Sequence, residues 1–205
     1  MKLYLKNHTE RYPVEQLQLQ LFAQEPSEFC TEPFTGDGTV SSLSRGKRYL
    51  TATAKVTYQG KTGFAVNRVL LDRADVRATR RILQRSYYLA ALQVLPAAPP
   101  WGALSGVRPT KLSTKCLMAG GSEKDAEKLL PEGGLVAPER AGLCVDASRH
   151  TVEAAKLLDA DDLSVYIGIP FCPTRCAYCS FVSQSIERFG EFLPAYLDAL
   201  LREIA

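Results

Sequence analysis

A run near the C-terminus that contains three cysteines reads Tyr166-Ile-Gly-Ile-Pro-Phe-Cys172-Pro-Thr-Arg-Cys176-Ala-Tyr-Cys179-Ser-Phe181. An apolar segment runs into a loop that carries three cysteines with the spacing C-x3-C-x2-C. Three thiolates this close together can hold three irons of a cubane iron–sulfur cluster and leave the fourth iron without a protein ligand. The spacing therefore predicts that Cys172, Cys176 and Cys179 are metal ligands of a 4Fe-4S cluster.

A redox cluster with an open coordination position can bind a small molecule and pass it an electron. This favours a radical enzyme that uses S-adenosylmethionine (SAM) over a passive electron carrier. Two alternatives explain less of the pattern. Structural zinc needs four ligands, and the nearest histidine, His150, lies 22 residues upstream of Cys172 in a predicted helix. A thioredoxin-like redox pair would use Cys176 and Cys179 but would leave Cys172 unexplained.

The segment before the loop predicts a strand over 163–169 with two unlike faces. Large apolar side chains alternate with smaller or polar ones, so that Leu163, Val165, Ile167 and Ile169 face one way and Ser164, Tyr166 and Gly168 the other. Residues 192–205 predict a helix with an apolar face and with Pro194 in its first turn. Strand, cysteine loop and helix together predict one βα unit. If it belonged to a β/α barrel, the active site would form at the C-terminal end of the strand, where the cysteines begin.

Residues 1–71 predict a small α+β unit. Residues 2–6 alternate as a strand, whereas 12–23 fit either a strand or one face of a helix, of which we favour the helix. Residues 48–58 and 62–71 are rich in β-branched and aromatic residues and flank Gln59-Gly60, which predicts a hairpin. The glycines within 35–39 predict a loop or a turn.

Residues 72–160 predict a helical connector that starts with a long amphipathic helix over 72–95. At 100° per residue its apolar face consists of Val76, Leu83, Tyr87, Ala90 and Val94. Arg77, Arg81 and Arg85 follow one another at i, i+4 spacing and lie well off that face. Prolines from Pro96 onward stop this helix.

Three shorter helices are predicted in the rest of the connector. Pro109 and Gly120 suit the start and the end of the first. Ser122 and Asp125 have the spacing of a capping box for the second, which Pro131 is expected to terminate. The third fills most of 138–158.

Composition excludes some classes of protein. The 205 residues are 46% hydrophobic, enough for a core, but no apolar run is long enough to span a membrane, and the N-terminus does not resemble a secretory signal. The net charge of +3 is too small to argue for nucleic acid. Cys30, Cys116 and Cys144 are scattered, as expected of small core side chains in a reducing, cytoplasmic setting.

The quoted cysteine run resembles the cluster loop of the radical SAM superfamily, and more narrowly that of oxygen-independent coproporphyrinogen III oxidases. The segment Trp101-Gly-Ala-Leu-Ser-Gly-Val-Arg-Pro-Thr-Lys-Leu112 is similar to the connector of the HemZ subgroup, often called coproporphyrinogen dehydrogenase. Gly168 supports the subgroup, because the better-known branch has histidine there. The resemblance implies an α/β fold in three parts: the α+β unit 1–71, the helical connector 72–160, and a truncated start of the radical SAM barrel at 161–205.

The resemblance also implies two cofactors and a reaction. SAM would bind the open iron of the 4Fe-4S cluster, Tyr166 would contact SAM, and Tyr178 would pack near the cofactor or simply cover the cluster. The cleaved SAM would yield a 5′-deoxyadenosyl radical that takes a hydrogen from a propionate of coproporphyrinogen III. Loss of an electron and of carbon dioxide leaves a vinyl group, and two rounds give protoporphyrinogen IX, a step of haem biosynthesis. The implied partners are the porphyrinogen and an electron donor protein.

No catalytic side chain is assigned, and a chain that ends after one βα unit is expected to be inactive alone. One alternative is a non-enzymatic haem chaperone, although such relatives lack the connector motif. Another is an N-terminal binding module over 1–160, with nucleic acid as a candidate ligand and with a vestigial cluster loop. Five basic residues could meet propionates, although a solvated helix face or a local ion pair explains each of them better: Arg77, Arg81, Arg85, Arg108 and Lys111.

Overall fold

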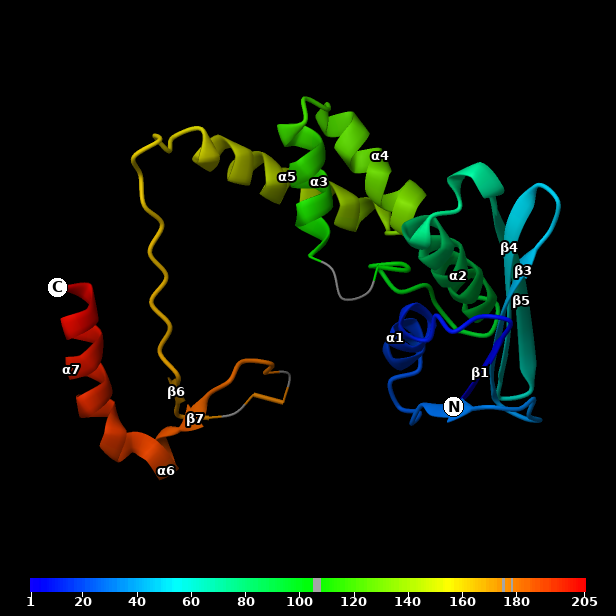
Figure 1. The fold of residues 1–205 in the computed structure, drawn as a ribbon, viewed down its shortest axis with the longest axis horizontal. Helices are drawn as coiled ribbons and strands as arrows, with labels where there is room; N and C mark the ends of the chain where they lie inside the picture. Colours follow the sequence, from blue (N-terminus) through cyan, green and yellow to red (C-terminus); the bar gives the residue numbers. More distant parts are fainter. Residues whose placement is uncertain (105–107, 175, 178) are drawn as a thin grey trace. The chain divides into compact units, whose positions relative to one another are not determined.

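The computed structural model describes residues 1–104, 108–174, 176–177 and 179–205 (Figure 1). Tyr178 and residues 105–107 of the connector motif, both named above, therefore lie outside the described residues. The chain divides into two compact units, Met1–Leu158 and Asp159–Ala205, here called the first and the second unit. It mixes helices and strands, which confirms the α/β class. No helix in the described part of the chain is long and apolar enough to cross a bilayer.

A mixed five-stranded sheet forms the base of the first unit. Its strand order is β2-β1-β3-β4-β5, where β1 is Lys2–Lys6, β2 is Glu28–Cys30, β3 is Gly38–Arg45, β4 is Tyr49–Tyr58 and β5 is Lys61–Leu70. The strand β1 runs parallel to both neighbours, whereas β3, β4 and β5 are antiparallel. The predicted hairpin is confirmed: Tyr58 pairs with Lys61, and Gln59 and Gly60 both have positive φ, as a tight two-residue turn requires. The strands β2 and β3 were not predicted.

Two helices cover one face of this sheet (Figure 1). The helix α1 (Tyr12–Leu21) confirms the helical interpretation of 12–23, because it buries Val14 and Leu17 while Leu19 stays exposed. The helix α2 (Val76–Ala91) lies across β4 and β5. It therefore lies in the layer that covers the sheet.

The helix α2 is shorter than predicted at both ends. A 3-10 turn at Leu71–Arg73 precedes it, and Asp75 caps it by accepting a 2.6 Å hydrogen bond from the Ala78 amide. Most of the predicted apolar face is buried, but Val76 is 60% exposed because it lies at the first turn, beyond the sheet. The helix ends four residues before 95, yet Val94 remains in the core.

Three helices complete the first unit: α3 (Pro109–Met118), α4 (Glu123–Gly134) and α5 (Pro138–Ala155). The predicted capping box at the start of α4 is confirmed, since the amide of Asp125 bonds to the Ser122 hydroxyl and the Asp125 carboxylate accepts from the Ser122 amide. The expected stop at Pro131 is wrong. The helix continues for one turn and closes at Leu135, whose left-handed conformation lets its amide bond to the Pro131 carbonyl at 2.9 Å.

The second unit contains little regular structure before its last helix. Its elements are the two-residue parallel pair β6 (Phe171–Cys172) and β7 (Gln184–Ser185), then α6 (Ile186–Phe189), a 3-10 turn at Gly190–Phe192, and α7 (Leu193–Ile204). The helix α7 confirms the helix predicted over 192–205, with Pro194 in its first turn.

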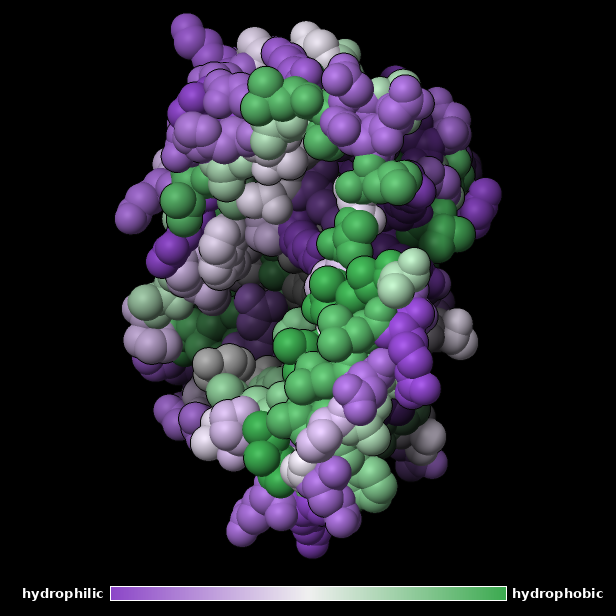
Figure 2. Space-filling view, turned by 90° about the vertical axis from the view of Figure 1, so that its left-hand side faces the viewer, coloured by the Kyte–Doolittle hydropathy of each residue, from purple (hydrophilic) through white to green (hydrophobic). Residues whose placement is uncertain are grey.

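The strand predicted over 163–169 is absent, which corrects the βα unit expected there. Alternating sequence alone does not make a strand, because each strand needs a neighbour for its backbone hydrogen bonds. Among the described residues, only Phe171–Cys172 pairs with another segment here, β7. Leu163 is 90% exposed, and the other three residues of the predicted apolar face are exposed as well. Figure 2 shows apolar side chains gathered in a band on the surface.

Candidate functional site

The three cysteines lie close together in the sequence of the second unit, Cys172 in β6 and the other two on the short loop between β6 and β7. Cys172 ends β6 and is half-buried, as is Cys179, while Cys176 is exposed. The amide of Cys179 donates a 3.0 Å hydrogen bond to the carbonyl of Cys176, which makes a tight turn. The thiol of Cys172 donates to the carbonyl of Thr174 at 2.7 Å. The loop therefore folds on itself and presents its thiols at or near the surface.

The base of the loop is held from two sides. The amide of Gln184 donates to the carbonyl of Pro170 at 2.7 Å, beside the β6–β7 pair. From α7, the hydroxyl of Tyr196 donates to the carbonyl of Gly168, and the Tyr196 ring lies edge-on to Phe171 with 5.4 Å between the ring centroids. The helix α7 thus fixes the segment that leads into the loop.

Tyr166 lies in this leading segment and is 87% exposed. Its ring lies next to Gly168, since a Cβ added to Gly168 would be 3.3 Å from the Tyr166 ring. This agrees with the prediction that the two residues face the same way, although they lie in extended chain rather than in a strand.

The donor set of the loop suits an iron–sulfur cluster, because all three donors are thiols within eight residues. The positions of the described side chains, in contrast, do not form a metal site. Among the residues that the structure describes, no three His, Cys, Asp or Glu side chains are grouped so as to hold a metal. The Cys172 thiol is turned to a backbone carbonyl instead.

His150 is placed as predicted, in α5 of the first unit, and makes close contacts with carboxylates of its own helix. Nδ1 of His150 lies 3.3 Å from Glu153, and Nε2 lies 3.8 Å from Asp146. These contacts account for the residue without a role as a metal ligand.

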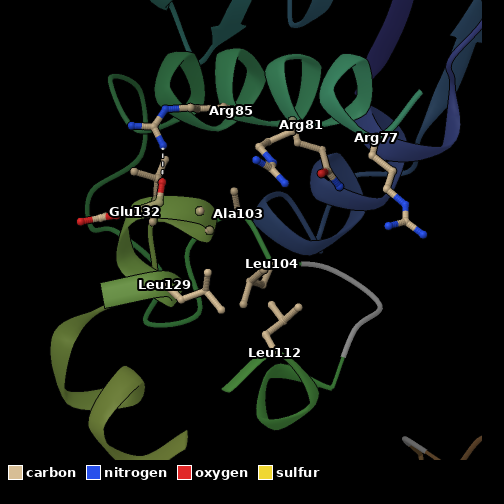
Figure 3. A pocket seen from close by; sticks show the side chains of 12 residues that line it. Arg77, Arg81, Arg85, Ala103, Leu104, Leu112, Leu129 and Glu132 are labelled. Atoms are coloured by element: carbon tan, nitrogen blue, oxygen red, sulfur yellow. Dashed lines mark hydrogen bonds between the residues drawn. The ribbon is translucent and has the colours of Figure 1, made fainter. Parts of the chain in front are cut away.

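The first unit contains a pocket of about 520 Å³ that sequence reasoning did not identify (Figure 3). Three of the five singled-out basic residues line it, namely Arg77, Arg81 and Arg85, whereas Arg108 and Lys111 do not. The opposite lining comes from residues far away in the sequence: Ala103, Leu104, Leu112, Leu129, and Glu132 to Leu135 of α4 and its cap. The i, i+4 spacing of the arginines was the only signal of it in the sequence.

Comparison with known proteins finds that the chain is similar in sequence to a curated protein. It is 31% identical over 188 residues to the oxygen-independent coproporphyrinogen-III oxidase-like protein HemZ of Bacillus subtilis (strain 168). The matched region covers 87% of this chain and 36% of that protein. No family model matches the chain, and no solved structure matches it. Over most of its length the chain is thus similar to this HemZ protein, of which it spans about a third of the length.

Proposed function

We propose that the chain is the cluster-bearing part of a HemZ-like radical SAM oxidoreductase of porphyrin biosynthesis. The observation that carries the proposal is the C-x3-C-x2-C loop within a chain that is 31% identical to HemZ over 188 residues. In this proposal the complete protein converts propionates of coproporphyrinogen III into vinyl groups in the cytoplasm, with electrons from a donor protein.

In this proposal different residues bind the two cofactors. Cys172, Cys176 and Cys179 would hold a 4Fe-4S cluster, and Tyr166, exposed in the segment that leads into the loop, would contact SAM. Tyr178 would lie against the same cofactors. When bound, the cluster and SAM supply a one-electron reduction that generates a carbon radical.

The remaining contacts of the second unit would orient this loop. Tyr196 fixes the carbonyl of Gly168, and its ring packs on Phe171, one residue before the first thiol. Phe171 and Cys172 are themselves paired with β7. The backbone of Cys172 is therefore anchored beside the turn that carries Cys176 and Cys179.

Anaerobic reconstitution with iron and sulfide tests the proposal. We expect about four irons per chain and the electron paramagnetic resonance signal of a reduced cluster. Cys172→Ala should lose both, whereas Cys30→Ala, a half-buried cysteine of the first unit, should keep them. One zinc per chain without uptake of iron would overturn the cluster.

The porphyrin chemistry needs a separate test in the protein of full HemZ-like length. Cleavage of SAM under reducing conditions, coupled to loss of carbon dioxide from coproporphyrinogen III, is the expected result. Stoichiometric haem binding without SAM cleavage would instead assign the protein to the haem chaperones.

A further inference from the structure

The pocket in the first unit combines a row of cations with an apolar wall (Figure 3). Arg77, Arg81 and Arg85 lie on three successive turns of α2, so that each is displaced from the next by about 6 Å along the helix. Across the cavity lie the side chains of Leu104, Leu112 and Leu129, which point toward one another in Figure 3. A volume of about 520 Å³ is within the range of sites for small molecules.

The arginines of this row lack the partners that a purely structural role would give them. In the described part of the chain, none of the three forms an ion pair with a carboxylate. Arg80 of the same helix does form one, with 2.7 Å between its Nε and Glu10. Three like charges at i, i+4 spacing repel one another, so an uncompensated row weakens its own helix.

One end of the row is already ordered. Nη1 of Arg85 donates a 2.9 Å hydrogen bond to the backbone carbonyl of Glu132, which ties α2 to the last turn of α4. The bond uses one donor of the guanidinium and leaves the others for a ligand. Arg77 and Arg81 are exposed and make no side-chain hydrogen bond to any described residue, so they can turn toward an anion.

The residues that line the pocket also indicate which kind of anion it can bind. Guanidinium groups bind carboxylates through two parallel hydrogen bonds, and the leucine wall favours an apolar body between the charges. No aromatic side chain is among the described lining residues, so the pocket offers no surface for stacking a nucleotide base.

We propose that this pocket binds an apolar molecule that carries at least two carboxylates, held by Arg77, Arg81 and Arg85 against the wall of Leu104, Leu112 and Leu129. The identity of the natural ligand rests on the proposed function, since coproporphyrinogen III has propionates on an apolar macrocycle. The pocket itself does not, because it lies wholly in the first unit and needs no cluster. It would be a carboxylate site additional to the cofactor loop.

The test is a titration of the full chain with coproporphyrin III, the stable oxidised tetracarboxylate, by equilibrium dialysis and by the emission of Trp101. Trp101 is the single tryptophan and packs on the same small core as Leu104 and Leu112, so its emission reports on the wall. We expect one bound molecule per chain. The tetramethyl ester of coproporphyrin, which lacks the charges, should bind at least tenfold more weakly.

Matched variants locate the binding. Arg77→Gln combined with Arg81→Gln should weaken binding of coproporphyrin at least tenfold and should make it less sensitive to salt. Arg80→Gln removes a guanidinium that Glu10 already engages, so it should leave binding unchanged. Circular dichroism checks that each variant remains folded.

Three results would overturn the proposal. Equal binding of the ester would indicate adsorption on exposed apolar surface, and equal losses in Arg80→Gln and in the double variant would indicate attraction by general charge. Equal affinity for a long-chain alkyl phosphate would assign the pocket to phosphates instead. Cys172→Ala separates the two proposals, because it should abolish the cluster and leave binding of coproporphyrin intact.

Discussion

Gly63 and Gly133 both lie in regular secondary structure, yet the space around them differs. A Cβ on Gly63 of β5 would lie 2.0 Å from the carbonyl oxygen of Ala90, because α2 packs directly on the strand there. A Cβ on Gly133 of α4 would meet nothing within 4 Å, and its φ is not positive.

Gly63→Ala should therefore lower the free energy of unfolding by about 1–3 kcal/mol or more, as overpacking does. Gly133→Ala should raise it by about 0.5–1 kcal/mol, since alanine has the higher helix propensity. Urea denaturation followed by Trp101 emission measures both. Equal effects of the two changes would show that α2 does not approach β5 as closely as described.

The imidazole of His8 makes the stability of the first unit dependent on pH. Its Nε2 lies 3.2 Å from both the carbonyl and the hydroxyl oxygen of Ser41, and its burial lowers the pKa of His8 below 6.5. As pH falls below 6.5, the unfolded state therefore takes up a proton before the folded state does.

This contribution to the free energy of unfolding is fully present above pH 6.5 and is lost as pH falls through the lowered pKa of the folded state. Denaturation at pH 7.5 and pH 5.5 measures the loss. His8→Gln should remove this component, while His150→Gln, at an exposed position on α5, should retain it. An unchanged pH dependence in His8→Gln would assign it to other groups.

At the scale of elements, hydrophobic periodicity predicted the structure where one face of an element packs on a core. It identified α1, α2 and the β4–β5 hairpin, whose buried positions are mostly apolar. It missed β3 because two of the inward positions of that strand hold Thr39 and Ser41, both fully buried, so that the alternation is hidden. It also predicted a strand over 163–169, where the alternation is clear but pairing is lacking.

Of the candidate functional sites, one could be predicted from the sequence and the other could not. Ligand spacing is local, so the cysteine loop could be identified from sequence alone. The pocket could not, because α2, the 103–104 segment, α3 and α4 contribute to it from positions up to 58 residues apart. Which apolar residues face the arginines depends on how α4 packs, and no periodicity encodes that.

The helices α3 and α5 are joined by a buried pair of hydroxyls. The Oγ atoms of Ser113 and Ser148 lie 2.7 Å apart, and both bond to the carbonyl of Thr110 at 3.2 Å. Ser113 also contacts the carbonyl of Cys144 at 3.3 Å. Small polar residues thus allow the two helices to approach closely at this point.

Either Ser113→Ala or Ser148→Ala should lower the free energy of unfolding by about 1 kcal/mol, because the remaining hydroxyl loses a buried partner. The double change should cost less than the sum of the two, by about 0.5 kcal/mol or more. A double-mutant cycle in urea measures this coupling. Simple additivity would mean that the two hydroxyls do not act as a pair.

At the scale of the whole molecule, charge is divided unequally between the units. The first unit has 22 Lys and Arg against 15 Asp and Glu, whereas the second has 3 against 7. The modest net charge of +3 conceals this division. A basic first unit suits an anionic small molecule, because its field raises the local concentration of such a ligand.

The units should also differ in resistance to proteolysis. The chain after α5 is exposed at Leu157, Leu158 and Leu163, and it has no regular structure before β6. Proteases cut exposed chain that can adapt to their active sites, while segments within a packed core resist. Brief digestion with chymotrypsin should therefore release a persistent N-terminal fragment that ends between 157 and 166.

Mass spectrometry of the digest identifies the end of that fragment. Cys172→Ala serves as a control, because it alters the loop without changing any cleavage site between 157 and 166. It should yield the same fragment at the same rate. An early cut within β3, β4 or β5 would contradict the description of residues 1–158 as one compact unit, since the buried core of that unit lies against those strands.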